Sequence, residues 1–504
     1  MPAKGSLTLA LALLLVAAIP ARAAAFPAIT VLDTNSGTTG SNPYTFAAFS
    51  GYLYYAASNS AVGYELWRTD GTTLGTTLVK DINANGTDGS NPYGFTALGD
   101  YLYFNANDGV NGTELWRTDG TESGTTRVSN INTSAGAGSS PENLIALSGY
   151  LYFRADDGTN GTELWRTDGT TLGTTLVKEI NTSAGGSSYP DYFAALSGYL
   201  YFQANDGTNG AELWRTDGTT LGTTLVKEIN TNEGDSSYPY ELTALSGYLY
   251  FGADDGDGYE LWRTDGTMLG TTLVKEINTN EGGSSSPGNF TAFDGYLYFK
   301  AKDGTNGYEL WRTDGTTLGT TLVKEINTSA GGDSDPGGFT ALGDYLYFQA
   351  DNGTNGYELW RTDGTTLGTT LVADINTSAG DGSEPWNFTA LGGYIYFTAS
   401  DDGTRYDPWR VDSSGLTESS SIPGTNSGIG CECYPQLVTL NGRLFMAAYS
   451  DETGYELAYL DEPTGGLPPT NRDGSVWSTT LVILAALTAV AGVGLRLRKG
   501  SIAK

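Results

Sequence analysis

Short stretches in which hydrophobic and polar residues alternate recur along this chain, and Gly, Asp or Asn residues close most of them. In residues 174–222 the stretches are 175–180, 191–196, 199–204 and 212–216. Alternation with a period of two predicts β-strands, and Asp-Gly between two such stretches predicts a tight turn. No window shows the 3.6-residue apolar period of a surface helix. The pattern therefore predicts an all-β protein made of short strands.

This group of four predicted strands is repeated. A tryptophan within Glu-Leu-Trp-Arg-Thr-Asp-Gly-Thr, or an eroded form of it, marks eight copies, at Trp67, Trp116, Trp165, Trp214, Trp262, Trp311, Trp360 and Trp409. A proline marks nine copies, at Pro43, Pro92, Pro141, Pro190, Pro239, Pro287, Pro336, Pro385 and Pro435. Four short strands in a period of 48–49 residues are typical of propeller blades. We therefore expect residues 24–461 to form a β-propeller of about nine four-stranded blades.

The two ends of the repeat array predict that the ring closes. Residues 28–33 match the outer strand of a unit, and residues 455–460 match the last strand of an otherwise incomplete ninth unit. The N-terminal strand can then complete the ninth blade and leave no open sheet edge. Nine units exceed the roughly four to eight blades of most propellers. An open β-solenoid and an eight-bladed ring with an unattached ninth unit are the alternatives.

The repeated motif, which stands in the first copy as Glu65-Leu66-Trp67-Arg68-Thr69-Asp70-Gly71-Thr72, resembles the ELWxxDGT repeat family of predicted bacterial surface proteins. The resemblance covers residues 29–460. It implies tandem repeats and export from the cell, and it brings no established activity and no catalytic residues.

The two termini predict where the protein resides. Residues 1–23 combine one cation, an apolar run and a small-residue end, which is the layout of a secretory signal peptide. Residues 476–495 contain no charge and are long enough for a transmembrane helix. The basic tail 496–504 follows, so the tail is expected in the cytoplasm and the repeats outside the cell. A buried core helix is the alternative for residues 476–495.

A Pro/Gly-rich linker, residues 462–475, precedes the apolar segment and contains Leu467-Pro468-Pro469-Thr470-Asn471. Leu467, Pro468 and Thr470 resemble the LPxTG cell-wall sorting signal, whose Gly is replaced here by Asn471. The other interpretation is an extended juxtamembrane linker. Both place the protein at the cell surface, anchored in the membrane or attached to the wall.

Composition narrows the possible functions. The net charge is −31, which argues against nucleic acid as a partner because such binding depends on Lys and Arg contacts with phosphate. The chain has no His, so catalysis by an imidazole base and zinc binding by His are excluded. Cys431 and Cys433 are the only cysteines; outside the cell they pair with each other or stay as a local feature, and without His they are a weak metal signal.

The eight repeated tryptophans have two interpretations. Each could offer a flat face to a sugar ring, or each could fill the wedge between neighbouring blades. Their near-identity in every copy favours packing. The Asp-Gly pair that follows each motif is interpreted as a tight turn, in which Asp binds backbone amides and Gly adopts a positive φ.

The loops before the third and fourth motifs, and before the fifth, contain oxygen-bearing side chains at short spacings that could bind Ca²⁺. These candidate ligands are Asp157, Asn160 and Glu163; Asp206, Asn209 and Glu212; and Asp255, Asp257 and Glu260. The spacing falls short of an EF-hand, and an Asp-Gly turn is the alternative. Calcium is the one cofactor that the sequence suggests.

The candidate binding surface lies where these loops share a face with the long connections between units. Differences between copies gather there, as in residues 232–235, 333–335 and 384–386. Arg154, Lys300, Lys302 and Arg405 also depart from the repeat. We expect a non-enzymatic surface protein that binds an extracellular glycan or protein in adhesion or recognition. A structural cell-envelope repeat protein and an extracellular polysaccharide hydrolase are the alternatives.

Overall fold

The computed structural model describes residues 26–35, 39–232, 234–378, 380–415, 417–419, 428–429, 436–450 and 453–461. The predicted signal peptide, the linker with Leu467, Pro468 and Thr470, the segment 476–495, the tail and both cysteines lie outside these residues. Within them every regular element is a strand, and no helix occurs that would be long and apolar enough to cross a membrane.

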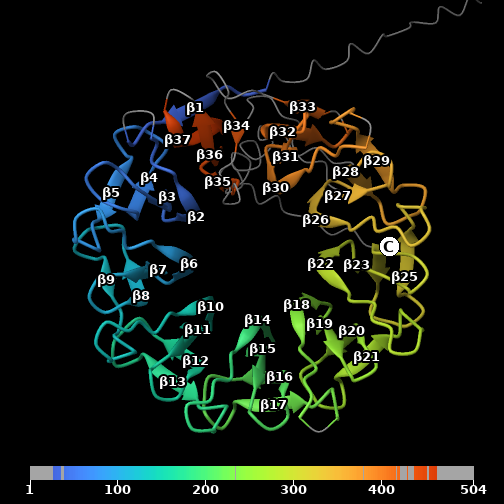
Figure 1. Cartoon of the computed structure of the whole chain (residues 1–504), viewed down its shortest axis with the longest axis horizontal. Coiled ribbons are helices and arrows are strands. Elements are labelled where there is room, and N and C mark those ends of the chain that lie inside the picture. Colours follow the sequence, from blue (N-terminus) through green and yellow to red (C-terminus); the bar gives the residue numbers. More distant parts are fainter. Residues whose placement is uncertain are drawn as a thin grey trace, which may run out of the picture.

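The chain forms a closed ring of nine antiparallel sheets, so the prediction of a nine-bladed β-propeller is confirmed (Figure 1). Eight blades are four-stranded meanders that run from the ring centre outwards. The innermost strands are β2 (Tyr44–Phe49), β6 (Tyr93–Leu98), β10 (Glu142–Leu147), β14 (Asp191–Leu196), β18 (Tyr240–Leu245), β22 (Gly288–Phe293), β26 (Gly337–Leu342) and β30 (Trp386–Leu391). The second strands are β3 (Tyr52–Ala57), β7 (Tyr101–Asn107), β11 (Tyr150–Asp156), β15 (Tyr199–Asn205), β19 (Tyr248–Asp254), β23 (Tyr296–Ala301), β27 (Tyr345–Asp351) and β31 (Tyr394–Ala399).

The third strands carry the repeated motif. They are β4 (Glu65–Thr69), β8 (Thr113–Thr118), β12 (Thr162–Thr167), β16 (Ala211–Thr216), β20 (Tyr259–Thr264), β24 (Glu309–Thr313), β28 (Tyr357–Thr362) and β32 (Asp407–Asp412). The outermost strands are β5 (Thr77–Lys80), β9 (Thr126–Arg127), β13 (Thr175–Lys178), β17 (Thr224–Lys227), β21 (Thr272–Lys275), β25 (Thr321–Lys324), β29 (Thr370–Ala373) and β33 (Thr417–Ser419). We number these blades 1 to 8 in chain order.

Blade 9 joins the two ends of the ring. Its strands are β34 (Gly428–Ile429), β35 (Val438–Leu440), β36 (Arg443–Ser450), β37 (Gly454–Asp461) and β1 (Ile29–Leu32). The N-terminal β1 pairs antiparallel with β37, with Ile29 opposite Leu460, so the predicted completion of the last blade by the first strand is confirmed. This blade departs from the four-stranded pattern because β34 and β35 both pair with β36, at its two ends.

The hydrophobic core is divided among the wedges between adjacent blades. Between blades 3 and 4, Tyr152 and Leu164 of one blade pack against Phe202 and Trp214 of the next. Trp214 is only 7% exposed, too little for a sugar to stack on its face. Trp214 therefore packs between blades, as the packing interpretation expects.

The Asp-Gly hairpins form as predicted. In blade 4, Oδ1 of Asp217 accepts hydrogen bonds from the backbone N–H and the hydroxyl of Thr219, at 2.8 and 2.7 Å. Both hydrogen bonds lower the pKa of Asp217, and the one from the hydroxyl has the larger effect. Gly218 adopts a φ of +90°, where a side chain would be strained.

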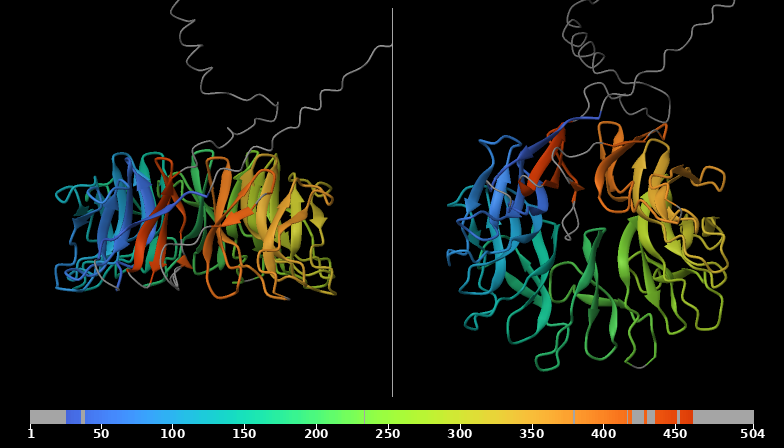
Figure 2. Two further views of the ribbon diagram at one scale, coloured as in Figure 1. Left: turned by 90° about the horizontal axis from the view of Figure 1, so that it is seen from above. Right: turned by 45° about the horizontal axis from the view of Figure 1, so that its top comes forward.

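Loops lie on two faces of a flat disc, which Figure 2 shows edge-on in its left panel. The connections between blades and the loops between second and third strands share one face, which we call the connection face. A bond of 3.2 Å from Nδ2 of Asn280, in such a connection, to the carbonyl of Gly304, in such a loop, confirms this prediction. The Asp-Gly hairpins lie toward the other face.

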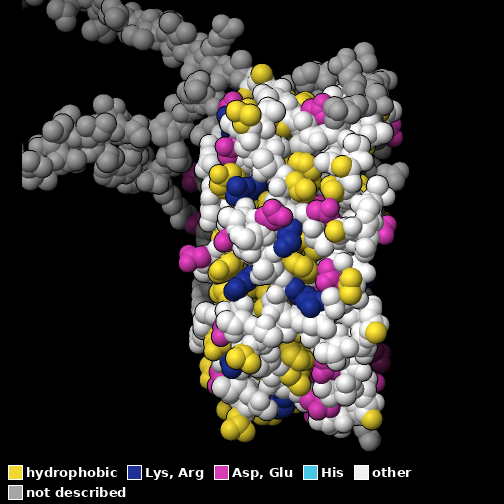
Figure 3. Space-filling model, turned by 90° about the vertical axis from the view of Figure 1, so that its left-hand side faces the viewer, with side chains coloured by type: hydrophobic (Ala, Val, Ile, Leu, Met, Phe, Trp, Pro, Cys, Tyr) yellow, Lys and Arg dark blue, Asp and Glu magenta, His cyan; other side chains and the backbone are white. Residues whose placement is uncertain are grey.

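The outer wall is made of these hairpins and the outermost strands. The hairpin of blade 4 is held by blade 3, because Nζ of Lys178 donates to the carbonyl of Thr223 and Oγ1 of Thr220 donates to that of Val177, both at 2.8 Å. Leu221 at its tip remains 93% exposed. On the wall around β5, β9 and β13, cationic, acidic and hydrophobic side chains are interspersed in small groups (Figure 3).

Candidate functional site

In every blade except blade 8, one glutamate ties neighbouring parts of the ring together. In blade 3, Oε2 of Glu163 accepts hydrogen bonds from the N–H of Ile180 (2.9 Å) and the hydroxyl of Ser188 (2.6 Å), and Oε1 accepts one from the N–H of Asn181 (3.2 Å). The donors belong to the connection that leads to blade 4. We call the eight equivalent residues the junction glutamates: Glu65, Glu114, Glu163, Glu212, Glu260, Glu309, Glu358 and Glu456.

The junction glutamates are at most 2% exposed. Burial raises the pKa of each, and the surrounding hydrogen-bond donors offset only part of this effect. For Glu163 the raised pKa is about 7. In blade 8 the position is held by Asp407, which pairs with Arg405 at 2.8 Å.

An arginine and a tyrosine form a second repeated junction. The guanidinium of Arg215 lies 4.7 Å from the ring centre of Tyr199, and its NH1 donates to the carbonyl of Gly266 in the next blade at 2.7 Å. Blade 9 keeps this contact, but there the arginine and the tyrosine have changed places: the arginine lies on the earlier of the two paired strands and the tyrosine on the later one. There Arg443 on β36 stacks on Tyr459 of β37 at 4.3 Å and donates to Gly71 of blade 1 at 2.8 Å.

The structure separates the candidate calcium ligands. Asp157 and Asn160 bond to each other within their loop, as do Asp206 and Asn209, whereas Glu163, Glu212 and Glu260 point into the blade junctions. Asp255 accepts from the N–H of Asp257. In the part of the chain that the structure describes, no three acidic or cysteine side chains gather in a way that could hold a metal ion. Calcium binding by these loops stays a prediction.

Four of the positions at which the blades differ lie close together, and we call them the rim positions. The first is the start of the innermost strand, occupied by Tyr44, Tyr93, Glu142, Asp191, Tyr240, Gly288, Gly337 and Trp386 in blades 1 to 8. The second is the next residue: Thr45, Gly94, Asn143, Tyr192, Glu241, Asn289, Gly338 and Asn387. The third faces the first across the sheet: Ala56, Asn105, Arg154, Gln203, Gly252, Lys300, Gln349 and Thr398. The fourth precedes the junction position: Tyr64, Thr113, Thr162, Ala211, Tyr259, Tyr308, Tyr357 and Tyr406.

A backbone irregularity brings the rim positions together. In blade 4, Asp191 pairs with Gln203, but the next pair is Ala194 with Tyr201, so the innermost strand contains a bulge. Tyr192 within it has a φ of +54°, and the second rim position of every one of blades 1 to 8 has a positive φ. Bulges re-aim side chains and increase local twist. Here the bulge turns Tyr192 outwards, and the side chain is 43% exposed.

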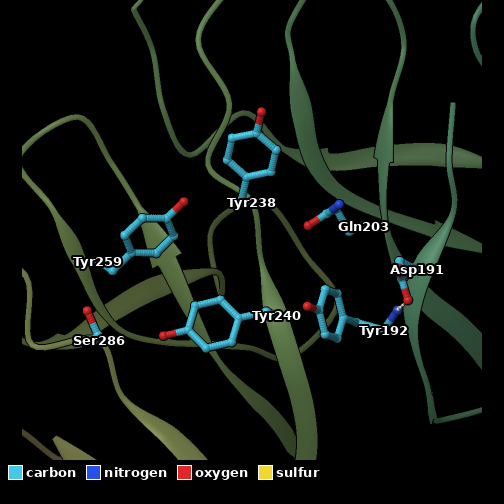
Figure 4. Close-up of a pocket in the computed structure, with 7 residues that line it drawn as sticks. All are labelled: Asp191, Tyr192, Gln203, Tyr238, Tyr240, Tyr259 and Ser286. Carbon is cyan, nitrogen blue, oxygen red and sulfur yellow. Dashed lines mark hydrogen bonds between the residues drawn. The ribbon is translucent and has the colours of Figure 1, made fainter.

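Rim residues of blades 4 and 5, together with Tyr238 and Ser286, which each precede a repeated proline, line a pocket of ≈ 470 Å³ (Figure 4). It is lined by Asp191, Tyr192, Gln203, Tyr238, Tyr240, Tyr259 and Ser286. The rings of Tyr192 and Tyr240 lie 6.4 Å apart at 61°, and those of Tyr240 and Tyr259 lie 5.9 Å apart at 59°. The tyrosines thus present aromatic surfaces in several directions around one space.

Fixed polar groups accompany these rings. Asp191 is held by Arg154 of blade 3 at 3.1 Å and by Nδ2 of Asn143 at 2.8 Å. Burial, followed by the nearby carboxylates of Asp191 and Glu241, raises the pKa of Tyr192. Burial also raises the pKa of Tyr240, and the nearby carboxylate of Glu241 raises it further. These tyrosines therefore keep their hydroxyl protons over the whole physiological pH range.

Sequence reasoning located the face but not the pocket. The pocket opens where the connections between blades enter the innermost strands, beside the predicted loops. Of the residues noted as differing between copies, Trp386, Arg154 and Lys300 occupy rim positions. The sequence does contain a signal for this site, because the pair of residues after each repeated proline differs in every copy. Its meaning depends on knowing that these residues begin the innermost strand.

No family model and no curated protein matches the chain. Among solved structures, puromycin hydrolase is similar with a TM-score of 0.37 and 14% identity over 73% of this chain and 59% of that one. Prolyl oligopeptidase B from Galerina marginata gives a TM-score of 0.39 and 10% identity over 71% and 56%. Oligogalacturonate lyase in complex with manganese gives 0.34 and 14% over 62% and 86%. The chain spans just over half the length of the first two proteins, and none of these values identifies a family or an activity.

Proposed function

We propose that this protein is a surface-anchored, non-enzymatic β-propeller that recognises an extracellular glycan through the pocket between blades 4 and 5. The observation that supports this most is the lining of that pocket, in which four tyrosines surround a space that Asp191, Gln203 and Ser286 also face. Pyranose rings offer apolar faces to aromatic side chains and hydroxyl groups to carboxylates and amides. The pocket provides both kinds of surface.

The charge of the site favours an uncharged sugar. Asp191 is the one charged side chain among the described residues that line the pocket, and the whole chain carries a net charge of −31. Acidic polysaccharides and nucleic acids would be repelled by this field. A neutral glycan avoids that repulsion and can donate hydrogen bonds from its hydroxyl groups to the Asp191 carboxylate.

Binding without turnover is supported by the same lining. Glycoside hydrolysis generally uses two carboxyl groups on either side of the scissile bond. The described pocket lining contains one, and Arg154 and Asn143 already engage it. The rival function, a structural envelope protein, would show itself as assembly that depends on protein concentration.

The proposal also includes anchoring of the propeller at the cell surface by the C-terminal part of the chain. The signal peptide 1–23, the LPxTG-like Leu467, Pro468 and Thr470, the apolar segment 476–495 and the basic tail 496–504 support display of the propeller outside the cell. The acidic loops of the connection face remain candidates for Ca²⁺, so binding should be measured with calcium and with chelator.

The test is binding of the full chain, in detergent micelles, to a glycan array, followed by calorimetry with the best neutral oligosaccharide. Tyr238→Ala and Tyr240→Ala are expected to weaken binding about tenfold each, because each removes an aromatic contact. Tyr93→Ala is the matched control, since Tyr93 holds the same rim position as Tyr240 in blade 2, away from the pocket. Unchanged affinity of the two pocket variants, or release of shortened sugars, would contradict the proposal.

A further inference from the structure

Blade 8 reproduces the aromatic pair of the pocket. Tyr240 and Tyr259 hold the first and fourth rim positions in blade 5, and Trp386 and Tyr406 hold the same positions in blade 8. The equivalence is one of structure, because Tyr240 pairs with Gly252 and Trp386 pairs with Thr398 at the same point of the sheet. Trp386 is 49% exposed and Tyr406 is 38% exposed, so both offer aromatic surface to solvent.

The blades between these two pairs keep the tyrosine but carry a buried glycine in place of the first aromatic residue. Tyr308 in blade 6 and Tyr357 in blade 7 hold the fourth rim position, and the first position is glycine in both, at Gly288 and Gly337. Polar groups lie there as well. Nζ of Lys300 pairs with Asp335 at 2.6 Å, and the hydroxyl of Tyr357 donates to the other oxygen of Asp335 at 3.3 Å.

The aromatic rim is one-sided, as blades 2 and 3 show. There the fourth rim position is Thr113 and Thr162, and in blade 4 it is Ala211. From the pocket, tyrosines at this position continue through blades 6, 7 and 8, and the position is tyrosine again in blade 1, where Tyr64 contacts Tyr44. A ligand that leaves the pocket along the rim therefore finds aromatic surface on one side and threonine on the other.

A second hollow lies at the far end of this path. Its volume is ≈ 260 Å³, and Asn387 and Phe388, which directly follow Trp386, line it with Gln436 and Leu437 of blade 9. Trp386 and Tyr406 do not line this hollow themselves; it lies beside the residues that follow Trp386 in the innermost strand.

We infer that the ligand is an oligosaccharide long enough to run along the rim from blade 5 to blade 8, with Trp386 and Tyr406 forming a second subsite. This inference rests on the proposed function, because it concerns the length of the glycan that the pocket recognises. A monosaccharide or disaccharide would fill the pocket of blades 4 and 5 alone. A longer chain would gain contacts with Tyr308, Tyr357 and finally Trp386.

The test measures affinity against chain length. The full chain is titrated with neutral cello-, malto- and chito-oligosaccharides, from the monosaccharide to the octasaccharide, by calorimetry. We expect affinity in the recognised series to rise in two steps, the second about tenfold and reached only by the longer chains. Trp386→Ala should remove the second step and leave short ligands unchanged, whereas Tyr240→Ala should weaken both. Tyr93→Ala, at the equivalent position of blade 2, should alter neither.

The possible failures are distinguishable. Equal affinity for short and long chains, or an unchanged second step in Trp386→Ala, would overturn the extended subsite and leave the pocket as proposed. Absence of binding by oligosaccharides of every length would overturn both the proposed function and this inference. Circular dichroism of Trp386→Ala shows that any loss of binding is not a loss of fold, since the side chain is half exposed on a strand end.

Discussion

The junctions between blades and the rim around the ring centre use the same repeat in opposite ways. At the junctions, the glutamate and the Arg–Tyr pair recur almost without change, and their contacts recur with them. At the rim, the first position alone is filled by Tyr, Glu, Asp, Gly and Trp in different blades. The two regions lie in one sheet, a few residues apart, and the rim has the same bulged backbone conformation in each of blades 1 to 8. A difference in backbone conformation between these blades therefore does not explain why one region is constant and the other varies.

The contrast indicates which residues build the ring and which are free to serve a ligand. A junction residue meets the same neighbour in every blade, so a change in one copy breaks a buried contact. Exposed rim residues such as Tyr192 and Trp386 can differ between copies without opening the core, whereas other rim residues, such as Asn105 and Gln349, are buried. Asymmetric chemistry, with tyrosine at the fourth rim position of blades 1 and 5 to 8 and threonine or alanine in blades 2 to 4, is therefore carried on a nearly symmetric scaffold.

The largest effect is expected from a junction residue. Glu163→Ala leaves the N–H groups of Ile180 and Asn181 and the Ser188 hydroxyl without their acceptor in the interior. We expect a loss of about 3–5 kcal/mol in the free energy of unfolding, measured in urea. Glu122→Ala, on an exposed hairpin, is the control and should change stability by less than about 0.5 kcal/mol. Equal effects of the two changes would contradict the structural role of the junction.

The pH dependence of stability should report the same residues. The pKa of every junction glutamate is raised, that of Glu163 to about 7, so the folded protein binds these protons more tightly than the unfolded chain. The stability that the folded protein gains from this tighter proton binding is complete below about pH 4.5 and is lost as the pH rises to about 7. The midpoint temperature of thermal denaturation should therefore decrease as the pH is raised from about 4.5 to about 7.

Glu163→Gln sharpens this test. Because the amide cannot ionise, the variant should show a shallower fall, by the contribution of about one proton. Glu122→Gln provides the comparison. A slope that is the same in both variants would show that Glu163 does not titrate in this range.

The exchanged pair of blade 9 gives an intermediate effect. Arg443→Tyr removes the hydrogen bond to Gly71 and the stacking on Tyr459, so we expect a loss of about 1–2 kcal/mol. Adding Tyr459→Arg restores the arrangement of the other blades and should recover most of it. A double-mutant cycle by urea unfolding checks the coupling. Additive losses would mean that the exchange is not compensatory.

The smallest effects are expected at the rim and the outer wall. Tyr238→Ala, whose side chain is 51% exposed, should lower stability by less than about 1 kcal/mol while it weakens glycan binding. Leu221→Ala, at a hairpin tip, should change stability by less than about 0.5 kcal/mol and leave binding unchanged. Differential scanning calorimetry with and without glycan measures both effects. Strong destabilisation by Tyr238→Ala would remove the distinction between rim and junction.

Much of the fold could be predicted from the sequence because the repeat is regular. Strands predicted at 191–196 and 199–204 match β14 and nearly all of β15, and the first strand was correctly placed in the last blade. Tryptophan packing followed from the identity of its copies. What could not be predicted depends on register between strands. The inward turn of Glu163 and the bulge at Tyr192 arise from pairing and packing that local spacing does not contain.

Hydrogen–deuterium exchange of the full chain, with and without a saturating neutral oligosaccharide, tests the central claim most directly. Peptides that cover the rim of blades 4, 5 and 8, around Tyr192, Tyr240 and Trp386, are predicted to gain protection. The hairpin around Leu221 and the wall around Lys178 should exchange at unchanged rates. Protection confined to the hairpins or the outer wall, with the rim unaffected, would contradict the account.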